Sequence, residues 1–330
     1  MKISVYFSCF DIVYNTFENG ADMKRFFIFF CVVPTILFCK TSSDIKKNLL
    51  SSPDSAFFDA NRIFSWMEAD GNIITYRITG SCGLFWPKSE GGNLGFCSGL
   101  GVVGKVNGTI RTAWVEYGSE YRPGAITATG DIDSSVNRIY KINFDGSGDW
   151  DSWPWRYGAP LVKTATGDDS LDADGNPIPL LIGDQTLWMI NHDFDERSHD
   201  YIFTTKPLGL EVQITIWGYD DVPPYSDMMF VAWKLLNKGE HSINDAYVTL
   251  FLDYDIGDAS NDLVGCDTTL SLGYGYQREY DAVYESNSPG FGFVLLQGPL
   301  VPAPGHIGYC FGKEFNDAKN LPMTAFIGSG

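Results

Sequence analysis

The sequence is poor in basic residues. Its 330 residues include 23 Lys and Arg against 41 Asp and Glu, which gives a formal net charge of −18. Nucleic-acid binding needs clustered Lys and Arg to neutralise phosphates, so this balance argues against a nucleic-acid partner. The acids are spread over loops, which suits a soluble extracellular protein in a calcium-containing medium. Acidity that serves solubility alone is the alternative.

The N-terminal apolar segment is too short to cross a membrane. Met23-Lys24-Arg25 is followed by thirteen mostly apolar residues, 26–38. A span needs about 20 such residues, whereas a signal-peptide core needs 7 to 15. We therefore predict a signal peptide region over 1–39, with Met23 as the candidate true start, and no transmembrane span.

Cysteines are few, and three of the seven lie in the segment that export would remove. The other four form an even number in an exported chain, which predicts disulfides without fixing their pairing. Cys82 with Cys97 closes a short loop and is the preferred pair, while free buried thiols are the alternative. The four are Cys82, Cys97, Cys266 and Cys310.

Signatures of catalysis and of nucleotide binding are missing. The sequence has no G-x-S-x-G and no H-E-x-x-H. GLGVVGK (99–105) matches G-x-G-x-x-G, but a strand-like run follows it and Val106 stands where a P-loop needs Ser or Thr. We assign no catalytic residue and no cofactor-binding residue. A non-enzyme is favoured over an enzyme.

A group of metal-ligand residue types lies in NHDFDERSHD (191–200). Its spacing matches no zinc motif and no helix is evident. A solvated loop is therefore favoured over a metal site for His192, Asp193, Asp195, Glu196 and His199.

Short β-rich runs dominate what is present. The chain is 44% hydrophobic and 15% aromatic, with 35 glycines, a composition typical of all-β proteins. Apolar residues alternate with polar ones over 210–217, 229–235 and 248–252, which predicts half-buried strands. Asn107-Gly108 between two such runs predicts a hairpin. Residues 57–71 permit a helix or a strand that ends in a turn at Asp70-Gly71.

These strands predict an all-β fold, one or more β-sandwich modules with long acidic loops, and two packed β units as a variant. Periodicity is lost over 145–179, which is rich in acids and prolines. The predicted organisation is a linker at 40–56, an N-terminal β unit at 57–144, an acidic loop insertion at 145–179, and a β-sandwich unit at 180–330.

The stretch DYDIGDASNDLVGCDTTLSLGYGYQ (253–277) carries five carboxylates between two strand-like runs. Crowded carboxylates raise one another's pKa or bind a cation, and calcium takes six to eight oxygen ligands. This is not an EF-hand, because Gly257 stands where the third ligand would be. A calcium site is preferred over a solvated loop and over a catalytic acid pair. The candidate ligands are Asp253, Asp255, Asp258, Asn261, Asp262 and Asp267.

Two loops of the insertion are weaker calcium candidates, because Asp-Gly and Asn-Pro are also ordinary turn formers. Their candidate ligands are Asp168, Asp172 and Asp174 in one loop, and Asp145, Asp149 and Asp151 in the other. Aromatic residues crowd into the same insertion and would either stack on sugars or, as we favour, pack beneath the loop. They are Trp150, Trp153, Trp155 and Tyr157.

An ordered series of motifs spans most of residues 60–330. It consists of GLFWPK (83–88), KVNGTIRTAWVEYGSEYRPG (105–124), GDQTLWMINHD (183–193), PLGLEVQITIWGY (207–219), the 253–277 stretch and PGFGFVLLQGP (289–299). Together they resemble the N-terminal β-rich extracellular region of long proteins carried by the type IX secretion pathway of gram-negative bacteria, a largely uncharacterised group. The resemblance implies a multi-domain exported protein with β-sandwich modules and further domains. Tyr254 stands where that group would have proline.

The resulting hypothesis is a secreted or cell-surface β-sandwich module stabilised by calcium. It would have an adhesion, surface-structural or carbohydrate-contacting role, with carbohydrate or another cell-surface component as its partner. The alternative is a secreted hydrolase, or an accessory module of an enzyme that degrades polysaccharide or protein.

Overall fold

The computed structural model describes residues 2–8, 12–13, 54–88, 91–200, 202–277, 280–285 and 288–328. Within them the regular elements are strands and short 3-10 helices of at most five residues, which confirms the all-β prediction. No helix in the described part of the chain has the length and hydropathy to span a membrane. The predicted signal-peptide core at 26–38 and residues 40–53 of the predicted linker lie outside the described residues.

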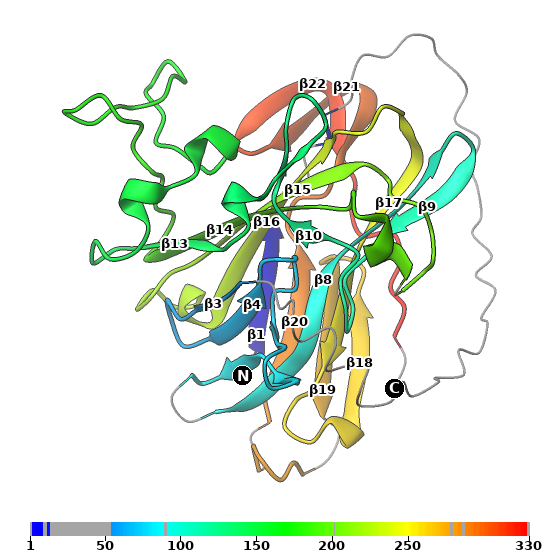
Figure 1. Cartoon of the computed structure of the whole chain (residues 1–330). Coiled ribbons are helices and arrows are strands. Elements are labelled where there is room, and N and C mark those ends of the chain that lie inside the picture. Colours follow the sequence, from blue (N-terminus) through cyan, green and yellow to red (C-terminus); the bar gives the residue numbers. More distant parts are fainter. Residues whose placement is uncertain are drawn as a thin grey trace.

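The larger sheet has ten strands in the order β10-β14-β15-β16-β1-β20-β19-β18, with β13 beside β14 and β2 beside β16 (Figure 1). Its strands are β1 (Lys2–Ser8), β2 (Ile12–Val13), β10 (Arg122–Pro123), β13 (Tyr140–Asn143), β14 (Gln185–His192), β15 (Leu210–Gly218), β16 (Met228–Asn237), β18 (Asp262–Asp267), β19 (Leu272–Gln277) and β20 (Gly290–Leu295).

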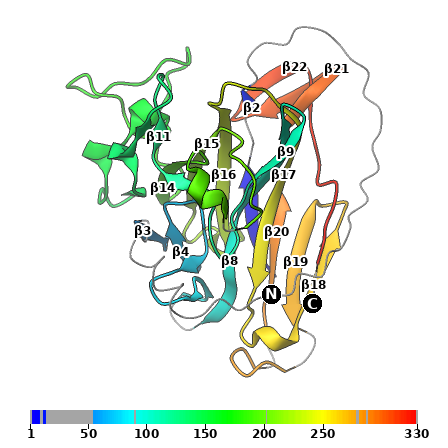
Figure 2. The ribbon, with the colours of Figure 1, turned by 45° about the vertical axis from the view of Figure 1, so that its right-hand side comes forward.

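The second sheet has six strands in the order β17-β8-β7-β4-β3, with β9 beside β8. Figure 2 shows β8 and β17 side by side. This pairing joins a strand of the predicted unit 180–330 to one of the predicted unit 57–144, so both contribute to one sheet. Its strands are β3 (Ser55–Phe58), β4 (Phe64–Glu68), β7 (Leu84–Trp86), β8 (Gly92–Val106), β9 (Thr109–Ala113) and β17 (Ile243–Tyr254).

Three two-stranded sheets and six 3-10 helices complete the described elements. The small sheets pair β5 (Thr75–Tyr76) with β6 (Ser81–Cys82), β11 (Ala125–Ile126) with β12 (Ile132–Asp133), and β21 (Leu300–Cys310) with β22 (Lys313–Asn320). The helices are η1 (Ser134–Val136), η2 (Trp150–Ser152), η3 (Trp155–Tyr157), η4 (Glu196–Asp200), η5 (Tyr225–Asp227) and η6 (Ala259–Asn261).

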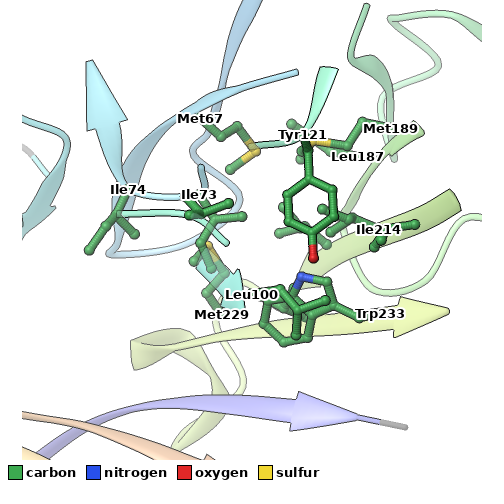
Figure 3. Close-up of a cluster of buried hydrophobic side chains, with 14 of the residues drawn as sticks. Met67, Ile73, Ile74, Leu100, Tyr121, Leu187, Met189, Ile214, Met229 and Trp233 are labelled. Atoms are coloured by element: carbon green, nitrogen blue, oxygen red, sulfur yellow. The ribbon is translucent and has the colours of Figure 1, made fainter. Parts of the chain in front are cut away.

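One apolar core lies between the two main sheets. Leu100 of β8 and Met67 of β4 pack in the same cluster as Ile214 of β15 and Met229 of β16 (Figure 3). Tyr121 is buried among them and donates its hydroxyl to the Ala113 carbonyl at 3.1 Å. Burial of this large apolar surface from both sheets is the main stabilising contribution to the sandwich.

The predicted insertion covers part of the outer face of the larger sheet, over β14 and the first half of β15. Trp153 and Leu161 pack with Trp188 and Ile190 of β14 in a second apolar cluster. This covering corrects the prediction of a half-buried strand at 210–217. Gln213 is only 7% exposed and donates to the Tyr157 carbonyl of the insertion at 2.9 Å, and Glu211 is 3% exposed and accepts from the Ile126 backbone N–H at 2.7 Å.

Local turn chemistry agrees with several predictions. Asn107 and Gly108 both adopt positive φ between β8 and β9, as a tight hairpin requires. The 57–71 segment is extended, not helical, with Gly71 at φ 95° in the turn after β4. The predicted linker at 40–56 ends too late, because Ser55 and Ala56 already pair with β4.

Candidate functional site

The acidic stretch 253–277 begins at the end of β17 and is anchored to β8. Asp253 accepts a hydrogen bond from the Tyr117 side chain, and burial raises its pKa. Asp255 accepts from the Cys82 thiol at 3.1 Å, and its backbone carbonyl accepts from Asn93 Nδ2 at 2.7 Å. These two carboxylates therefore already have protein donors.

Two of the predicted ligands serve local turns. Asp258 is the N-cap of η6 and accepts from the backbone N–H and hydroxyl of Ser260 at 3.0 and 2.7 Å. Asp267 does the same for Thr269 at 2.9 and 2.6 Å. Five strand steps of about 3.3 Å separate Asp267 from Asp262, so the structure does not bring Asp267 to the other carboxylates.

A residue that the sequence reasoning missed lies at the centre of this loop. Asp281 is fully buried and accepts from four donors, among them Asp258 N at 2.7 Å and Gln277 Nε2 at 2.8 Å. Val283 N and Tyr284 N are the other two, at 2.7 and 2.6 Å. Burial opposes ionisation, but these donors outweigh it and the pKa of Asp281 is lowered. Asp281 lies four residues beyond the sequence window, and only the fold brings it in.

Three oxygen atoms in the same region are buried and lack a hydrogen-bond partner. They belong to Asn261, Asp262 and Gln277, and the last two face each other in the β18–β19 register. The other Asp262 oxygen accepts from Ile256 N at 2.9 Å. Burial, together with Asp255, Asp281 and Asp258, raises the pKa of Asp262 to about 6. Buried acceptors without donors would be satisfied by a proton, a water or a cation.

This arrangement fits a calcium ion only in part. Amide and carboxylate oxygens are suitable ligands, and the unpartnered atoms provide three of them. However, among the described residues no three His, Cys, Asp or Glu side chains converge as a metal site would require. A cation here would be held mainly by Asp262 and by amide or backbone oxygens.

The weaker calcium loops of the insertion form ordinary turns. Asp172 accepts from the backbone N–H groups of Asp174 and Asn176 at 2.9 and 2.8 Å, and Asp168 accepts from Thr166 at 2.8 Å. In the other loop Asp145 accepts from Ser147, Asp149 forms an ion pair with Arg138 at 2.8 Å, and Asp151 is exposed in η2. The two loops do not converge on a shared set of carboxylates.

The 191–200 segment is only in part the predicted solvated loop, because Glu196 is exposed and Asp195 is half-buried, but the other three candidate residues are enclosed. His192, Asp193 and His199 are at most 1% exposed. Asp193 accepts from the backbone N–H groups of residues 208–210, and His199 Nε2 lies 2.8 Å from the Asp193 carbonyl. Burial lowers the pKa of His192 to about 4. This polar network ties the loop after β14 to the start of β15.

Disulfides are absent from the four predicted cysteines. Cys82 is hydrogen-bonded to Asp255, and Cys97 is buried in β8 opposite Asp253. Cys266 is exposed in β18, and Cys310 is buried in β21. The preferred pairing of Cys82 with Cys97 is therefore wrong: one thiol points to a carboxylate and the other is enclosed in the core.

An aromatic groove of about 530 Å³ lies on the outer face of the larger sheet. Trp217 of β15 stacks on Phe230 of β16 with ring centroids 5.5 Å apart, and the two residues are cross-strand partners. The ring centroid of Tyr219 lies 5.8 Å from that of Tyr225 and 5.9 Å from that of Phe230. Val222 and Leu296 complete the lining, and Tyr225 is 44% exposed.

The sequence signal for this groove is the set of four aromatic residues spaced through 217–230, whose exposure strand periodicity alone does not predict. The aromatic residues that the sequence did single out mostly pack. Trp153 is buried, Trp150 and Tyr157 pack against its cluster, and only Trp155 is more than one-third exposed. This outcome confirms the packing interpretation for Trp153.

No family model, no curated protein and no solved structure matches this chain.

Proposed function

We propose that this chain is a non-enzymatic binding module that contacts carbohydrate through the aromatic groove. The observation that carries the proposal is the stacked pair Trp217 and Phe230 with Tyr219 and Tyr225 around an open groove. Aromatic rings bury large apolar areas against flat apolar surfaces, and the C–H faces of sugar rings provide such surfaces. Aromatic walls with a few polar groups are typical of ligand sites.

Two carboxylates that lie next to groove residues in the chain support a sugar ligand over a purely apolar one. Asp220 and Asp221 are exposed between the groove residues Tyr219 and Val222. The Asp220 backbone N–H donates to Asp184 at 2.7 Å, which fixes this turn at the groove margin. Carboxylates in that position can accept hydrogen bonds from sugar hydroxyls.

The hydrolase alternative has less support. Carboxyls with a raised pKa are the expected acids of a glycosidase. Burial raises the pKa of Glu68 and of Asp193 to about 7, but both side chains are enclosed in the sandwich, and Asp262 lies in the acidic loop. None of the three lines the aromatic groove.

The proposed setting is a secreted or cell-surface protein related to type IX pathway cargo. The net charge of −18 and the signal-like segment at 26–38 support it. The motifs that carry the resemblance also supply both candidate sites, because 207–219 ends in Trp217 and Tyr219 and 253–277 holds the acidic loop. The four described cysteines are not in disulfides, so they offer no support for export.

Calcium is proposed as a stabilising ligand of the acidic loop. Its support is the group of unpartnered buried oxygens on Asn261, Asp262 and Gln277, together with the carboxylates that surround Asp262. A cation that binds only the folded state stabilises it by mass action. It would hold β18 and β19 to the end of β17 and leave the aromatic groove unchanged.

The carbohydrate proposal is tested by affinity electrophoresis in gels that contain xylan, laminarin, mannan or peptidoglycan fragments. Retardation by at least one polysaccharide is expected, and Trp217→Ala should weaken it about tenfold or more, or about 1.4 kcal/mol. Trp155→Ala is the matched control, since Trp155 is 37% exposed but lies in the insertion. Absence of retardation by all four, or equal retardation of both variants, contradicts the proposal.

The calcium proposal is tested by thermal unfolding after chelation. The unfolding temperature should rise when calcium, but not magnesium, is restored. Asp262→Asn should abolish this rise, whereas Asp267→Asn should retain it, because Asp267 lies five strand positions from Asp262 at the other end of β18. An unfolding temperature that is indifferent to calcium in the unsubstituted protein refutes it.

A further inference from the structure

Strand β1 occupies a slot between two strands that lie far apart in the sequence. It pairs with β16 from Ser4↔Met228 to Ser8↔Ala232, and with β20 from Lys2↔Gly290 to Phe7↔Leu295. Figure 1 shows it between them. Without β1, the described strands β16 and β20 would each present an unpaired edge within the sheet.

The direction of β1 distinguishes it from the rest of the two main sheets. Both of its ladders are parallel, and among the described strands the only other parallel ladder joins the neighbouring β2 to β16. All other named ladders are antiparallel. A parallel strand cannot enter through a tight hairpin, so β1 is added to the sheet from elsewhere in the chain.

The slot selects an extended segment with alternate apolar residues. Met229 and Val231 of β16 and Phe291 and Phe293 of β20 face the buried core. The register places Ile3, Val5 and Phe7 at the positions of those core-facing residues. A one-residue shift would instead place Lys2, Ser4 and Tyr6 there, so the alternation fixes the register.

We propose that the slot between β16 and β20 is a strand-acceptor site. Its partner is an extended peptide segment with apolar residues at alternate positions, which enters parallel to both strands. The backbone of residues 2–8 shows how such a segment binds, with a parallel ladder to each flanking strand. In this mode of recognition main-chain hydrogen bonds give affinity, and pockets for alternate side chains of the added segment give specificity. A form of the chain that starts at the predicted Met23, or that has lost residues 1–39, would offer the slot to such a segment in trans. Unprotected edges of this kind pair readily with other strands.

The test starts from the folded full chain, in which β1 is in place, and asks whether an added peptide can replace β1 after cleavage. A protease site is engineered at residues 18–22 of the full chain, and the folded protein is cleaved and mixed with a labelled peptide of residues 1–13. The labelled peptide is expected to replace the original fragment in a saturable way, and unlabelled peptide to compete. A peptide with Val5→Pro should fail, because proline cannot donate to the ladder. Equal incorporation of both peptides, or of neither, overturns the proposal.

A second variant covers the case in which the cleaved chain does not remain folded. In the uncleaved chain, Val5→Pro with Phe7→Pro should release the slot, and this variant should then bind the labelled peptide when the unsubstituted chain does not. Hydrogen exchange in β16 and β20 should be faster in the variant and slow again when peptide is added. Trp217→Ala in the same background should leave peptide binding unchanged, which separates the slot from the aromatic groove. Failure of the double variant to bind the peptide refutes a strand-acceptor site.

Discussion

Removal of the Asp193 carboxylate should be among the most destabilising single changes in this protein. Asp193 is 0% exposed and accepts from Leu208 N at 2.5 Å, Gly209 N at 3.0 Å and Leu210 N at 2.6 Å. Asp193→Ala would leave three buried N–H groups without acceptors. One orphaned buried donor costs about 1–3 kcal/mol, and loss of one partner from a buried charged interaction costs about 3–5 kcal/mol. We expect a loss of about 3–5 kcal/mol in the free energy of unfolding.

The assay is urea unfolding followed by tryptophan fluorescence, with Asp172→Ala as the matched control. Asp172 also accepts from two backbone N–H groups, but in an exposed turn where water can replace it. Its substitution should cost about 1 kcal/mol or less. Equal midpoints for the two variants would refute the reasoning that burial of the donors, rather than their number, sets the cost.

The pH dependence of Asp193→Asn tests the electrostatics of the same site. Burial raises the pKa of Asp193 to about 7, above its unfolded value of 3.8, although the backbone donors act in the opposite direction. A raised carboxyl pKa gives a contribution to stability that is complete below about pH 4 and is lost as the pH rises to 7. Asparagine does not titrate, while the neighbouring Glu120 and His199 are present in both proteins. The stability of the unsubstituted protein relative to Asp193→Asn should therefore fall between pH 4 and 7. A constant difference over that range would show that the backbone donors dominate.

Two further substitutions test how the loops are held. Gly257→Ala should destabilise the protein by about 1–3 kcal/mol, because a Cβ there would lie 2.3 Å from an Asp281 oxygen that is fixed by its donors. Gly167→Ala has a similar positive φ with nothing within 4 Å and should cost less, and equal unfolding midpoints would contradict this account. Trp153→Ala should cost about 3–5 kcal/mol and accelerate hydrogen exchange across 145–179 but not in β8, since Trp153 anchors the insertion. Trp155→Ala is its control, since Trp155 is 37% exposed, and exchange that rises equally in β8 would show that the insertion does not fold as a separate cluster.

The sequence by itself determined the all-β class and several local features. Alternation over 229–235 correctly predicts the core face of β16, because side chains on a strand have a period of two. Asn107-Gly108 predicts the hairpin, because these residues adopt positive φ at low cost. These are short-range properties, and neighbouring residues are sufficient to define them.

Sequence reasoning failed where burial depends on distant segments. The polar alternates Glu211 and Gln213 of β15 look solvent-facing, but both are buried. Glu211 accepts from the Ile126 backbone N–H of β11 at 2.7 Å, and Gln213 donates to the Tyr157 carbonyl of the insertion at 2.9 Å. The acids and histidines of 191–200 look like a hydrophilic loop, but backbone donors from the start of β15 allow them to be buried. Polar groups can be buried wherever hydrogen-bond partners are supplied, and composition does not reveal those partners.

The residues of the candidate sites also separate into those that the sequence marks and those that only the fold brings together. The density of carboxylates over 253–267 was visible in the sequence, and it marked the region in which Asp262 and Asn261 hold unpartnered oxygens. Only the tertiary structure could add Asp281 and Gln277, exclude Asp267, and assemble the aromatic groove from β15, η5, β16 and the residue after β20. Strand pairing brings these residues together across tens of positions in the chain. A strand pattern records which residues alternate, but it does not record which strand lies beside which.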